Sequence, residues 1–180
     1  TRQEAKAHTF KPLYGGTTGT EDQKRYYNDF KDKYMGIAIW HETLQEDAVK
    51  YREISLPSGR VYAFPDARWT KYGTATHRTA ICNYPVQGFA TADLLPIALV
   101  ALEKTVRDAN IRSVICNTVH DSIVMDVHPD EKNICIDLMK HAMLSLPFET
   151  VRRYGIAYNM PVGIEIKAGK NWLDLHDVEL

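Results

Sequence analysis

Two cations followed by two aromatic rings open the chain. Arg2, Lys6, Phe10 and Tyr14 recur at intervals of four residues. Because a helix turns about 100° per residue, each interval drifts by only about 40°, and the four side chains share one broad helical face. Such a face can hold a triphosphate at its basic end and a base and sugar at its aromatic end. An ordinary amphipathic helix with basic residues along its edge shows the same pattern.

A second polar group lies at the start of a long apolar run. Asn83 and Gln87 carry amides that both donate and accept, which suits the minor-groove acceptors that all base pairs share. Arg78 and Lys71 come shortly before them, where they can contact phosphates. Asn-Tyr-Pro is also an ordinary turn sequence, and a glutamine after it an ordinary surface residue.

The third candidate is the dipeptide His120-Asp121. It separates two runs rich in β-branched residues, 113–119 and 122–127, so a β-hairpin with the dipeptide at its tip is the simplest prediction. A carboxylate held on a rigid hairpin suits Mg²⁺, which binds a few carboxylates together with substrate phosphates. An aspartate in a turn can instead serve only to satisfy the backbone.

The surrounding pattern predicts mostly helices with two hairpins. The first helix should end at Gly15-Gly16, and Pro57-Ser58-Gly59-Arg60 should close a small hairpin. A helix near 75–82 should break at Tyr84-Pro85 and resume over 86–109, with an adjustment at Pro96. The other predicted elements are helices over 21–33, 37–51, 129–144 and 149–154 and an extended run over 161–167.

Composition restricts the class of protein without naming a function. The 180 residues are 44% hydrophobic and 25% charged, with a net charge of −1, so any nucleic-acid contact must come from local clusters of Lys and Arg. Cys82, Cys116 and Cys135 are widely spaced, and we expect reduced thiols with neither a disulfide nor a zinc site. The apolar run 86–102 is short for a membrane span and is expected to be a buried helix.

No secretory signal is visible, and the helical pattern is already running at residue 1. We therefore expect the chain to begin inside a larger protein.

Together, the three groups resemble the polymerase domain of family A DNA polymerases, the bacterial polymerase I and phage replicase group. The run from Arg2 to Gly15 is similar to the family's fingers helix. Asn83-Tyr84-Pro85-Val86-Gln87-Gly88, followed by Ala90, Ala92 and Asp93, resembles its Asn-x-Pro-x-Gln-Gly-x-x-Ala-Asp helix. Val119-His120-Asp121 resembles its third catalytic motif, and residues 161–172 resemble its final strand and Asn-Trp ending. The resemblance covers essentially the whole chain.

This resemblance implies a role for each candidate. Arg2 and Lys6 would bind the phosphates of the incoming nucleotide, Phe10 would stack on its sugar and base, and Tyr14 would guard the template-base pocket. Asn83 and Gln87 would touch the primer-template minor groove, with Arg78 and Lys71 beside them on the DNA. Asp121 would bind the catalytic metals, with His120 near the primer terminus. The implied reaction is attack of the primer 3′-hydroxyl on the α-phosphate of a deoxynucleoside triphosphate, assisted by two Mg²⁺ ions.

Four departures from the family pattern stand out. Thr9 and Lys11 flank Phe10, and Pro12 is expected to bend the helix and displace Tyr14. Thr79 stands where the family has an arginine. Ser122 follows His-Asp where the family commonly has glutamate. The family's second catalytic carboxylate, in an Asp-x-x-Tyr-Ser-x-x-Glu-like segment, does not occur in this sequence, so we expect the isolated chain to fold without polymerising.

Two other functions remain open from the sequence. One is a DNA-binding fragment or remnant of a polymerase without chemistry. The other is an unrelated metal-dependent phosphatase or nuclease that uses His120 and Asp121, with Asp126 and His128 as further ligands.

The predicted fold class is α+β, with an antiparallel palm sheet and flanking helices. The sheet is expected to combine the 113–127 hairpin with the terminal strand. Residues 1–69 are predicted to form part of the fingers, and residues 70–180 the C-terminal part of the palm. The expected partners are primer-template DNA, deoxynucleoside triphosphates and the upstream part of the same polymerase, in the cytoplasm of a bacterial or phage-infected cell and without a membrane.

Overall fold

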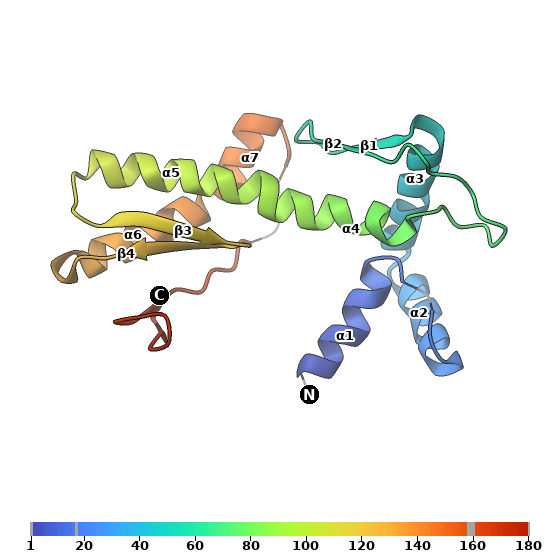
Figure 1. Ribbon diagram of the computed structural model, residues 1–180, viewed down its shortest axis with the longest axis horizontal. Helices are drawn as coiled ribbons and strands as arrows, with labels where there is room; N and C mark the ends of the chain where they lie inside the picture. Colours follow the sequence, from blue (N-terminus) through green and yellow to red (C-terminus); the bar gives the residue numbers. More distant parts are fainter. Residues whose placement is uncertain (1, 17, 158–160, 180) are drawn as a thin grey trace. The chain divides into compact units, whose positions relative to one another are not determined.

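The computed structural model describes residues 2–16, 18–157 and 161–179 and confirms the α+β class (Figure 1). The chain forms two compact units, Thr1–Phe89 and Ala90–Leu180. The sequence prediction placed its boundary after residue 69, so the compact units divide later in the chain than expected. The names fingers and palm for these parts stay predictions.

Two helix ends in the first unit coincide with recognisable sequence signals. The helices of this unit are α1 (Arg2–Leu13), α2 (Glu21–Lys33), α3 (Met35–Tyr51) and α4 (Arg78–Gly88). The predicted stop at Gly15-Gly16 is confirmed, and Gly15 adopts a φ of 77°. Thr20 and Gln23 form a capping box at the start of α2, in which each side chain accepts a hydrogen bond from the other's backbone N–H.

A small hairpin packs on α3 and α4 in this unit. Strands β1 (Glu53–Ser55) and β2 (Val61–Ala63) pair antiparallel, as predicted, around a turn in which Gly59 has a φ of 86°. The hairpin contributes to the apolar core of the unit, which consists of Leu44, Ala48, Ile54, Phe64, Ala67, Ala75 and Ile81. The hairpin is therefore fixed against the helix that carries Asn83 and Gln87.

The predicted helix break at Tyr84-Pro85 was wrong. Helix α4 runs through Pro85, which is buried, to Gly88. The irregularity comes later, as the π-helical turn η1 (Phe89–Leu94) directly before α5 (Leu95–Asp108), near whose start Pro96 lies. A proline ring crowds the carbonyl four residues earlier, and widening the preceding turn relieves this contact. The run Arg78–Asp108 is also long and apolar enough for a membrane span, a test that core helices pass as well.

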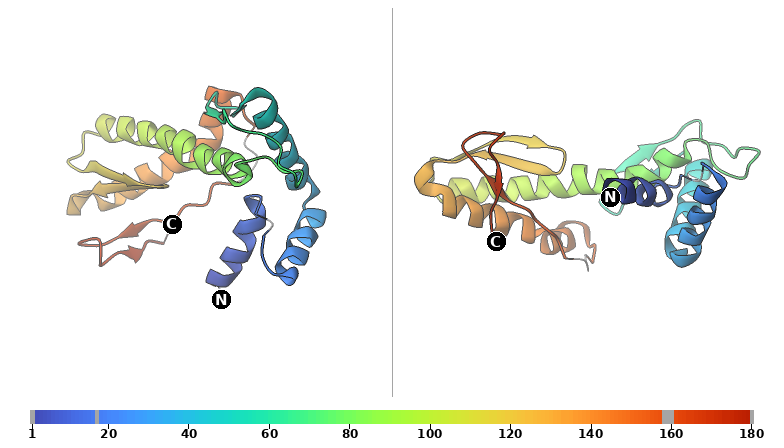
Figure 2. Two further views of the ribbon diagram at one scale, coloured as in Figure 1. Left: turned by 45° about the vertical axis from the view of Figure 1, so that its right-hand side comes forward. Right: turned by 90° about the horizontal axis from the view of Figure 1, so that it is seen from below.

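The second unit contains the predicted hairpin with His120-Asp121 at its tip. Strands β3 (Val114–Val119) and β4 (Ser122–Asp126) pair antiparallel, and a bulge at Cys116 shifts the register. The hairpin lies beside α5 and α6 (Lys132–Leu144), which pack on each other (Figures 1 and 2). Helix α7 (Leu146–Tyr154) follows α6 and starts slightly earlier than expected.

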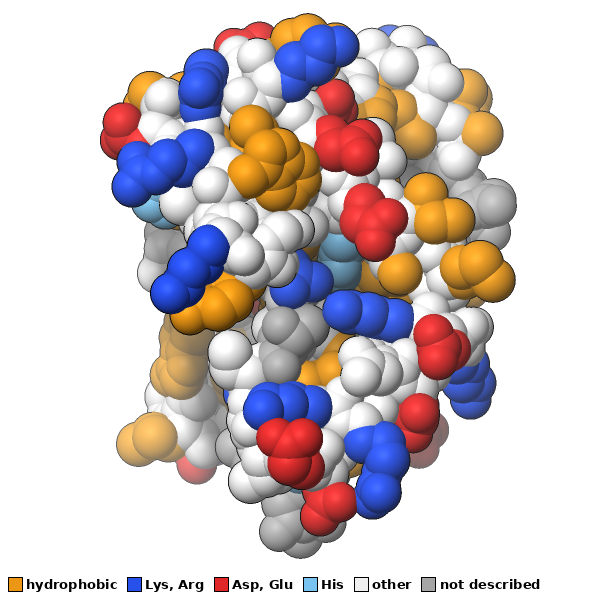
Figure 3. Space-filling model, turned by 90° about the vertical axis from the view of Figure 1, so that its right-hand side faces the viewer, with side chains coloured by type: hydrophobic (Ala, Val, Ile, Leu, Met, Phe, Trp, Pro, Cys, Tyr) orange, Lys and Arg blue, Asp and Glu red, His pale blue; other side chains and the backbone are white. Residues whose placement is uncertain are grey.

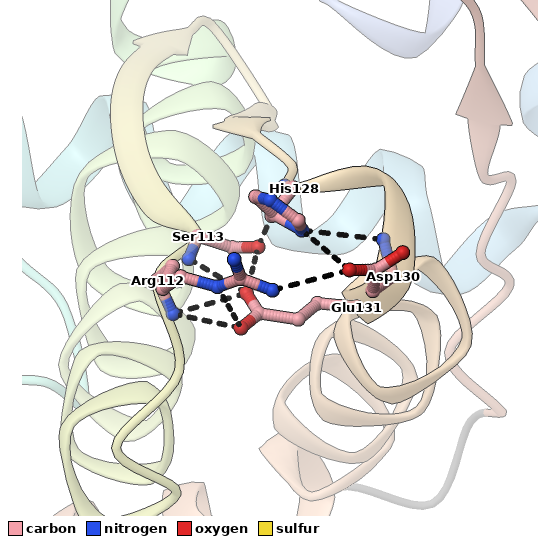
Figure 4. Close-up of polar contacts among 5 residues, drawn as sticks. All are labelled: Arg112, Ser113, His128, Asp130 and Glu131. Carbon is pink, nitrogen blue, oxygen red and sulfur yellow. Dashed lines mark hydrogen bonds and ion pairs between the residues drawn. The ribbon is translucent and has the colours of Figure 1, made fainter.

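A carboxylate clamp holds the base of this hairpin (Figure 4). Glu131, in the 3₁₀ turn η2 (Pro129–Glu131), accepts hydrogen bonds from the backbone N–H groups of Arg112 and Ser113 at 3.0 and 2.9 Å, and from the Ser113 hydroxyl at 2.6 Å. These hydrogen bonds, led by that from the Arg112 backbone, lower the pKa of Glu131 to about 2. The clamp ties the segment before β3 to the segment after β4 at the base of the hairpin.

The terminal run does not join this hairpin in the part of the chain that the structure describes. Strand β5 (Lys167–Ala168) pairs with β6 (His176–Asp177) in a separate two-stranded sheet. The Asn171 side chain accepts a hydrogen bond from the backbone N–H of Leu173 at 2.9 Å and closes the turn locally. The expectation of one sheet made of the 113–127 hairpin and the terminal run was therefore wrong.

Candidate nucleotide, DNA and metal site

The aromatic and basic face of α1 forms as the spacing predicted. The Lys6 Nζ lies 5.6 Å from the Phe10 ring centroid, and the Phe10 and Tyr14 centroids are 5.8 Å apart. Phe10 remains 40% exposed, so its ring is available to a ligand. The side chain of Arg2 lies outside the described residues. Lys6, Phe10 and Tyr14 therefore form one continuous face, which we call the α1 face.

Pro12 does not disrupt this face. Helix α1 continues through the buried proline to Leu13, and the Tyr14 backbone N–H still donates to the Phe10 carbonyl at 3.0 Å. A proline in the last turn removes only its own hydrogen bond. The expected displacement of Tyr14 from the line of Lys6 and Phe10 is not seen.

A long-range hydrogen bond joins the α1 face to the predicted DNA-reading motif. The Gln87 side-chain amide donates to the Tyr14 hydroxyl at 2.8 Å, and both residues belong to the first unit. The contact is possible because Gly15 lets α1 approach α4 closely. A Cβ at Gly15 would lie 3.0 Å from the Cys82 Sγ and 3.6 Å from the Arg78 Nε.

The other candidate DNA-binding residues lie in two places in the first unit. Asn83 and Arg78 lie on α4 with Gln87, and both are partly buried. The Asn83 Oδ1 atom is buried and has no hydrogen-bond partner among the residues that the structure describes. Lys71 lies apart, exposed on the loop before α4, with its Nζ 5.0 Å from the Tyr72 ring centroid.

Tyr62 in β2 is a contact of this motif that the sequence reading missed. A Cβ at Gly88 would overlap the Tyr62 hydroxyl, so the tyrosine lies directly against the backbone at the end of α4. Its ring also packs on Tyr84, with centroids 5.3 Å apart. A glycine inside a helical pattern was the available signal, because it often marks a close approach of another group.

The dipeptide His120-Asp121 occupies the hairpin tip in the second unit. His120 has a φ of 54°, a left-handed conformation that histidine tolerates but most side chains avoid. The Ser122 hydroxyl donates to the Val119 carbonyl at 2.8 Å and braces the turn. Both tip side chains are exposed.

Asp121 also lines a cavity of about 530 Å³ within the second unit. Ser122 and Glu165 contribute polar groups to this cavity, and its apolar wall includes Leu102 and Met139. Glu165 was not singled out from the sequence. The terminal run was expected beside the hairpin, but its local pattern does not distinguish Glu165 from other carboxylates.

The described residues do not gather a full set of metal ligands. Among residues 2–16, 18–157 and 161–179, no group of three or more His, Cys, Asp or Glu side chains gathers closely enough to hold a metal ion. The exposed Asp121 carboxylate has the oxygen chemistry that Mg²⁺ prefers, but one carboxylate falls short of a full ligand set. Asp121 is therefore a single candidate ligand among the described residues and does not make a magnesium site by itself.

The sequence is similar to those of known proteins. Residues 1–174 match the family described as DNA polymerase family A. DNA polymerase I of Lactococcus lactis subsp. cremoris is 29% identical over 96% of this chain and 20% of its own length, and the DNA polymerase of Bacillus phage SP01 is 27% identical over 92% of this chain and 18% of its own. The chain thus spans about a fifth of the length of these relatives.

The fold has a solved counterpart. The POL domain of Pol1 from M. smegmatis, solved with DNA primer-template and dNTP, has a TM-score of 0.70 at 24% identity, over 81% of this chain and 27% of that one. The family match extends over nearly all of the sequence and includes the α1 face, the Asn83–Gly88 motif and the His120-Asp121 tip. The chain belongs to DNA polymerase family A.

Proposed function

We propose that this chain is part of an enzyme that carries out template-directed DNA synthesis, in which a primer 3′-hydroxyl attacks the α-phosphate of a deoxynucleoside triphosphate. The observation that carries the proposal is the hydrogen bond between Tyr14 and Gln87. It joins a face suited to a nucleotide to a helix suited to the DNA minor groove. The bacterial and phage polymerases among the relatives support the same activity and indicate action in a bacterial or phage-infected cell.

The α1 face binds the incoming nucleotide in this proposal. Arg2 and Lys6 bind the phosphates, because cations one turn apart match a chain of phosphate oxygens. Phe10 stacks on the base and sugar through its exposed ring. Tyr14 guards the template-base pocket.

Helix α4 and the loop before it bind the primer-template. The amides of Asn83 and Gln87 contact the minor-groove acceptors that every base pair presents, which allows binding without sequence preference. Arg78 and Lys71 contact phosphates, and their contribution should weaken with added salt.

Asp121 supplies one carboxylate to the metal site, and His120 lies near the primer terminus. Bound Mg²⁺ ions supply charge stabilisation to the attacking and leaving oxygens. Because the described residues gather no fuller ligand set, we propose that the second carboxylate comes from another part of the polymerase. The isolated chain is then catalytically silent.

Substitution of Asp121 by Asn tests the proposal in a polymerase that contains this chain. Extension should fall below detection while primer-template affinity stays within a few-fold. Asp126→Asn removes the same charge from the far end of β4, where Asp126 pairs with Val114, and should retain extension. Retained turnover by Asp121→Asn would show instead a DNA-binding role without chemistry for the tip.

A further inference from the structure

The loop between β2 and α4 carries a tight turn at its tip. The Thr70 backbone N–H donates to the Thr74 carbonyl at 2.8 Å, and the Gly73 N–H donates to the Thr70 carbonyl at 3.1 Å. Gly73 has a φ of 72°, the left-handed conformation that glycine supplies in three-residue hairpin loops. Lys71 and Tyr72 are therefore the central residues of a hydrogen-bonded turn.

The base of this loop, which we call the 66–76 loop, is fixed to the rest of the first unit. The Thr76 hydroxyl accepts a hydrogen bond from the Arg68 backbone N–H at 3.1 Å. The buried Gln45 side chain of α3 accepts another, at 3.1 Å, from the backbone N–H of Ala75. Ala75 itself belongs to the apolar core of the unit. The turn is thus presented on a base that is held by hydrogen bonds and packing.

Two large aromatic side chains of the 66–76 loop are exposed. Trp69 is 47% exposed, and Tyr72, in the turn, is 78% exposed. The hydrogen bonds described above use backbone, threonine and glutamine groups and no atom of either ring. Flat rings on a fixed loop can stack on nucleic-acid bases, and only an unpaired strand leaves the faces of its bases free. Because the loop is already ordered, such binding costs little conformational entropy.

The charge of the loop is complementary to a nucleic-acid strand. Arg68 and Lys71 are exposed, and the sequence has no acidic residue over 67–77. The Lys71 Nζ lies 5.0 Å from the Tyr72 ring centroid, so a cation and a ring share one surface. Figure 3 looks at the side of the first unit on which this loop lies in Figure 1 and shows Lys and Arg side chains beside exposed hydrophobic ones. A base can stack on a ring there while its phosphate meets a cation.

We propose that the 66–76 loop binds single-stranded DNA, with Trp69 and Tyr72 stacking on unpaired bases. Arg68 and Lys71 pair with the phosphates of the same strand. The proposal rests on the proposed function and deepens it, because there Lys71 contacts a phosphate of the primer-template and the two rings have no part. The strand is either the unpaired template ahead of the primer or a strand displaced from the template.

Fluorescence anisotropy of a labelled oligothymidylate, in buffer without Mg²⁺ or deoxynucleotides, tests the proposal on the folded chain. Trp69→Ala and Tyr72→Ala should each weaken binding about fivefold or more, because a base loses its stacking partner. Trp69→Phe keeps a ring and should retain most of the affinity. Binding of a blunt duplex should be the same for all of these proteins, since its bases are stacked on each other.

Two matched variants control for the loss of an exposed ring. Trp172→Ala removes a tryptophan of the second unit that is 60% exposed. Tyr51→Ala removes an exposed tyrosine whose ring centroid lies 4.7 Å from the Nζ of the preceding Lys50, the same pair of residue types as in the turn. Both variants should bind oligothymidylate as the wild type does. An abasic strand with the same number of phosphates should bind wild type and Trp69→Ala equally, because it has nothing to stack.

Two DNA substrates separate the sources of the strand. One is a primer-template with a 5′ template overhang, and the other is a nicked duplex with a displaced 5′ flap. Weakening by Trp69→Ala with the overhang alone identifies the template, and weakening with the flap alone identifies the displaced strand. If Trp69→Ala and Tyr72→Ala bind oligothymidylate as tightly as the wild type, the proposal is overturned.

Equal weakening of single-stranded and duplex binding would also overturn it, because loss of general charge attraction or of the fold explains that result. The assay contains no metal ion and no nucleotide, so its outcome does not depend on Asp121. Failure of the extension test at Asp121 and failure of stacking at Trp69 are therefore distinguishable.

Discussion

The Gln87 side-chain amide donates a 2.8 Å hydrogen bond to the Tyr14 hydroxyl across 73 residues of sequence. This bond links the end of the α1 face to the helix that carries Asn83. A ligand that moves either residue therefore acts on the other.

Tyr14→Phe removes the hydroxyl and keeps the ring. In a double-mutant cycle with Gln87→Leu, the free energy of unfolding should show a coupling of about 0.5–1.5 kcal/mol, the usual net value of one hydrogen bond. Urea denaturation of the four proteins gives this value. Tyr72→Phe, at a tyrosine that is 78% exposed, should show no coupling to Gln87→Leu. Additive effects of Tyr14→Phe and Gln87→Leu would mean that the bond contributes nothing.

Gly88→Ala should destabilise the first unit by about 1–3 kcal/mol, because the new Cβ would overlap the Tyr62 hydroxyl. The matched control is Gly36→Ala in α3, where a Cβ meets nothing within 4 Å. That change should be neutral or stabilise by up to about 1 kcal/mol. Thermal unfolding compares the two.

Adding Tyr62→Phe to Gly88→Ala should recover part of the loss, since it removes the overlapping oxygen but leaves the ring close. Equal stability of the two single glycine variants would contradict the contact.

Glu131→Gln should lower stability at pH 7 by weakening the clamp on Arg112 and Ser113. The carboxylate has a folded pKa of about 2 against an ordinary value of 4.5. A carboxylate whose pKa is lower in the folded state than in the unfolded state stabilises the fold fully at pH values above its unfolded pKa. This stabilisation is lost as the pH falls towards the folded pKa. The difference in denaturant midpoint between wild type and Glu131→Gln should therefore become smaller as the pH falls from about 4.5 to 2.

Glu103→Gln is the control for charge alone, because Glu103 forms an ion pair with Arg107 at the exposed surface of α5. Its effect at pH 7 should be smaller than that of Glu131→Gln. A Glu131→Gln gap that keeps its full size at pH 2 would contradict the clamp.

His120→Gly and His120→Ala both remove the imidazole, but glycine adopts a positive φ more easily than alanine. At a φ of 54°, alanine should leave the hairpin about 1 kcal/mol less stable than glycine. Chemical denaturation measures this difference. If the imidazole acts near the primer terminus, both variants should lose extension equally, whereas a loss confined to alanine would assign the effect to the backbone.

Local signals were enough to predict much of the fold. Turn chemistry at Pro57-Ser58-Gly59-Arg60 and the two β-branched runs around His120-Asp121 located both hairpins. The interval of four residues placed Lys6, Phe10 and Tyr14 on one face. These features depend on residues that are neighbours in sequence.

The wrong predictions arose where tertiary packing or a nearer pairing partner outweighed the local sequence preference. Pro85 lies inside α4 because tertiary packing buries it, although proline generally disfavours a helix interior. The terminal run pairs with residues 176–177 because a tight turn at Asn171 offers a nearer partner than the hairpin. The contacts of Gln87 with Tyr14 and of Gly88 with Tyr62 connect distant segments and needed the structure.

Primer extension by the folded chain with Mg²⁺ and all four deoxynucleotides tests most directly whether Asp121 provides one half of a shared metal site. Circular dichroism is the check on folding. The chain alone should be silent. Extension should appear when a polypeptide that supplies the family's second carboxylate segment is added, and it should disappear again with Asp121→Asn. Extension by the chain alone, or restored activity that survives Asp121→Asn, would contradict the claim that Asp121 provides one half of a shared metal site.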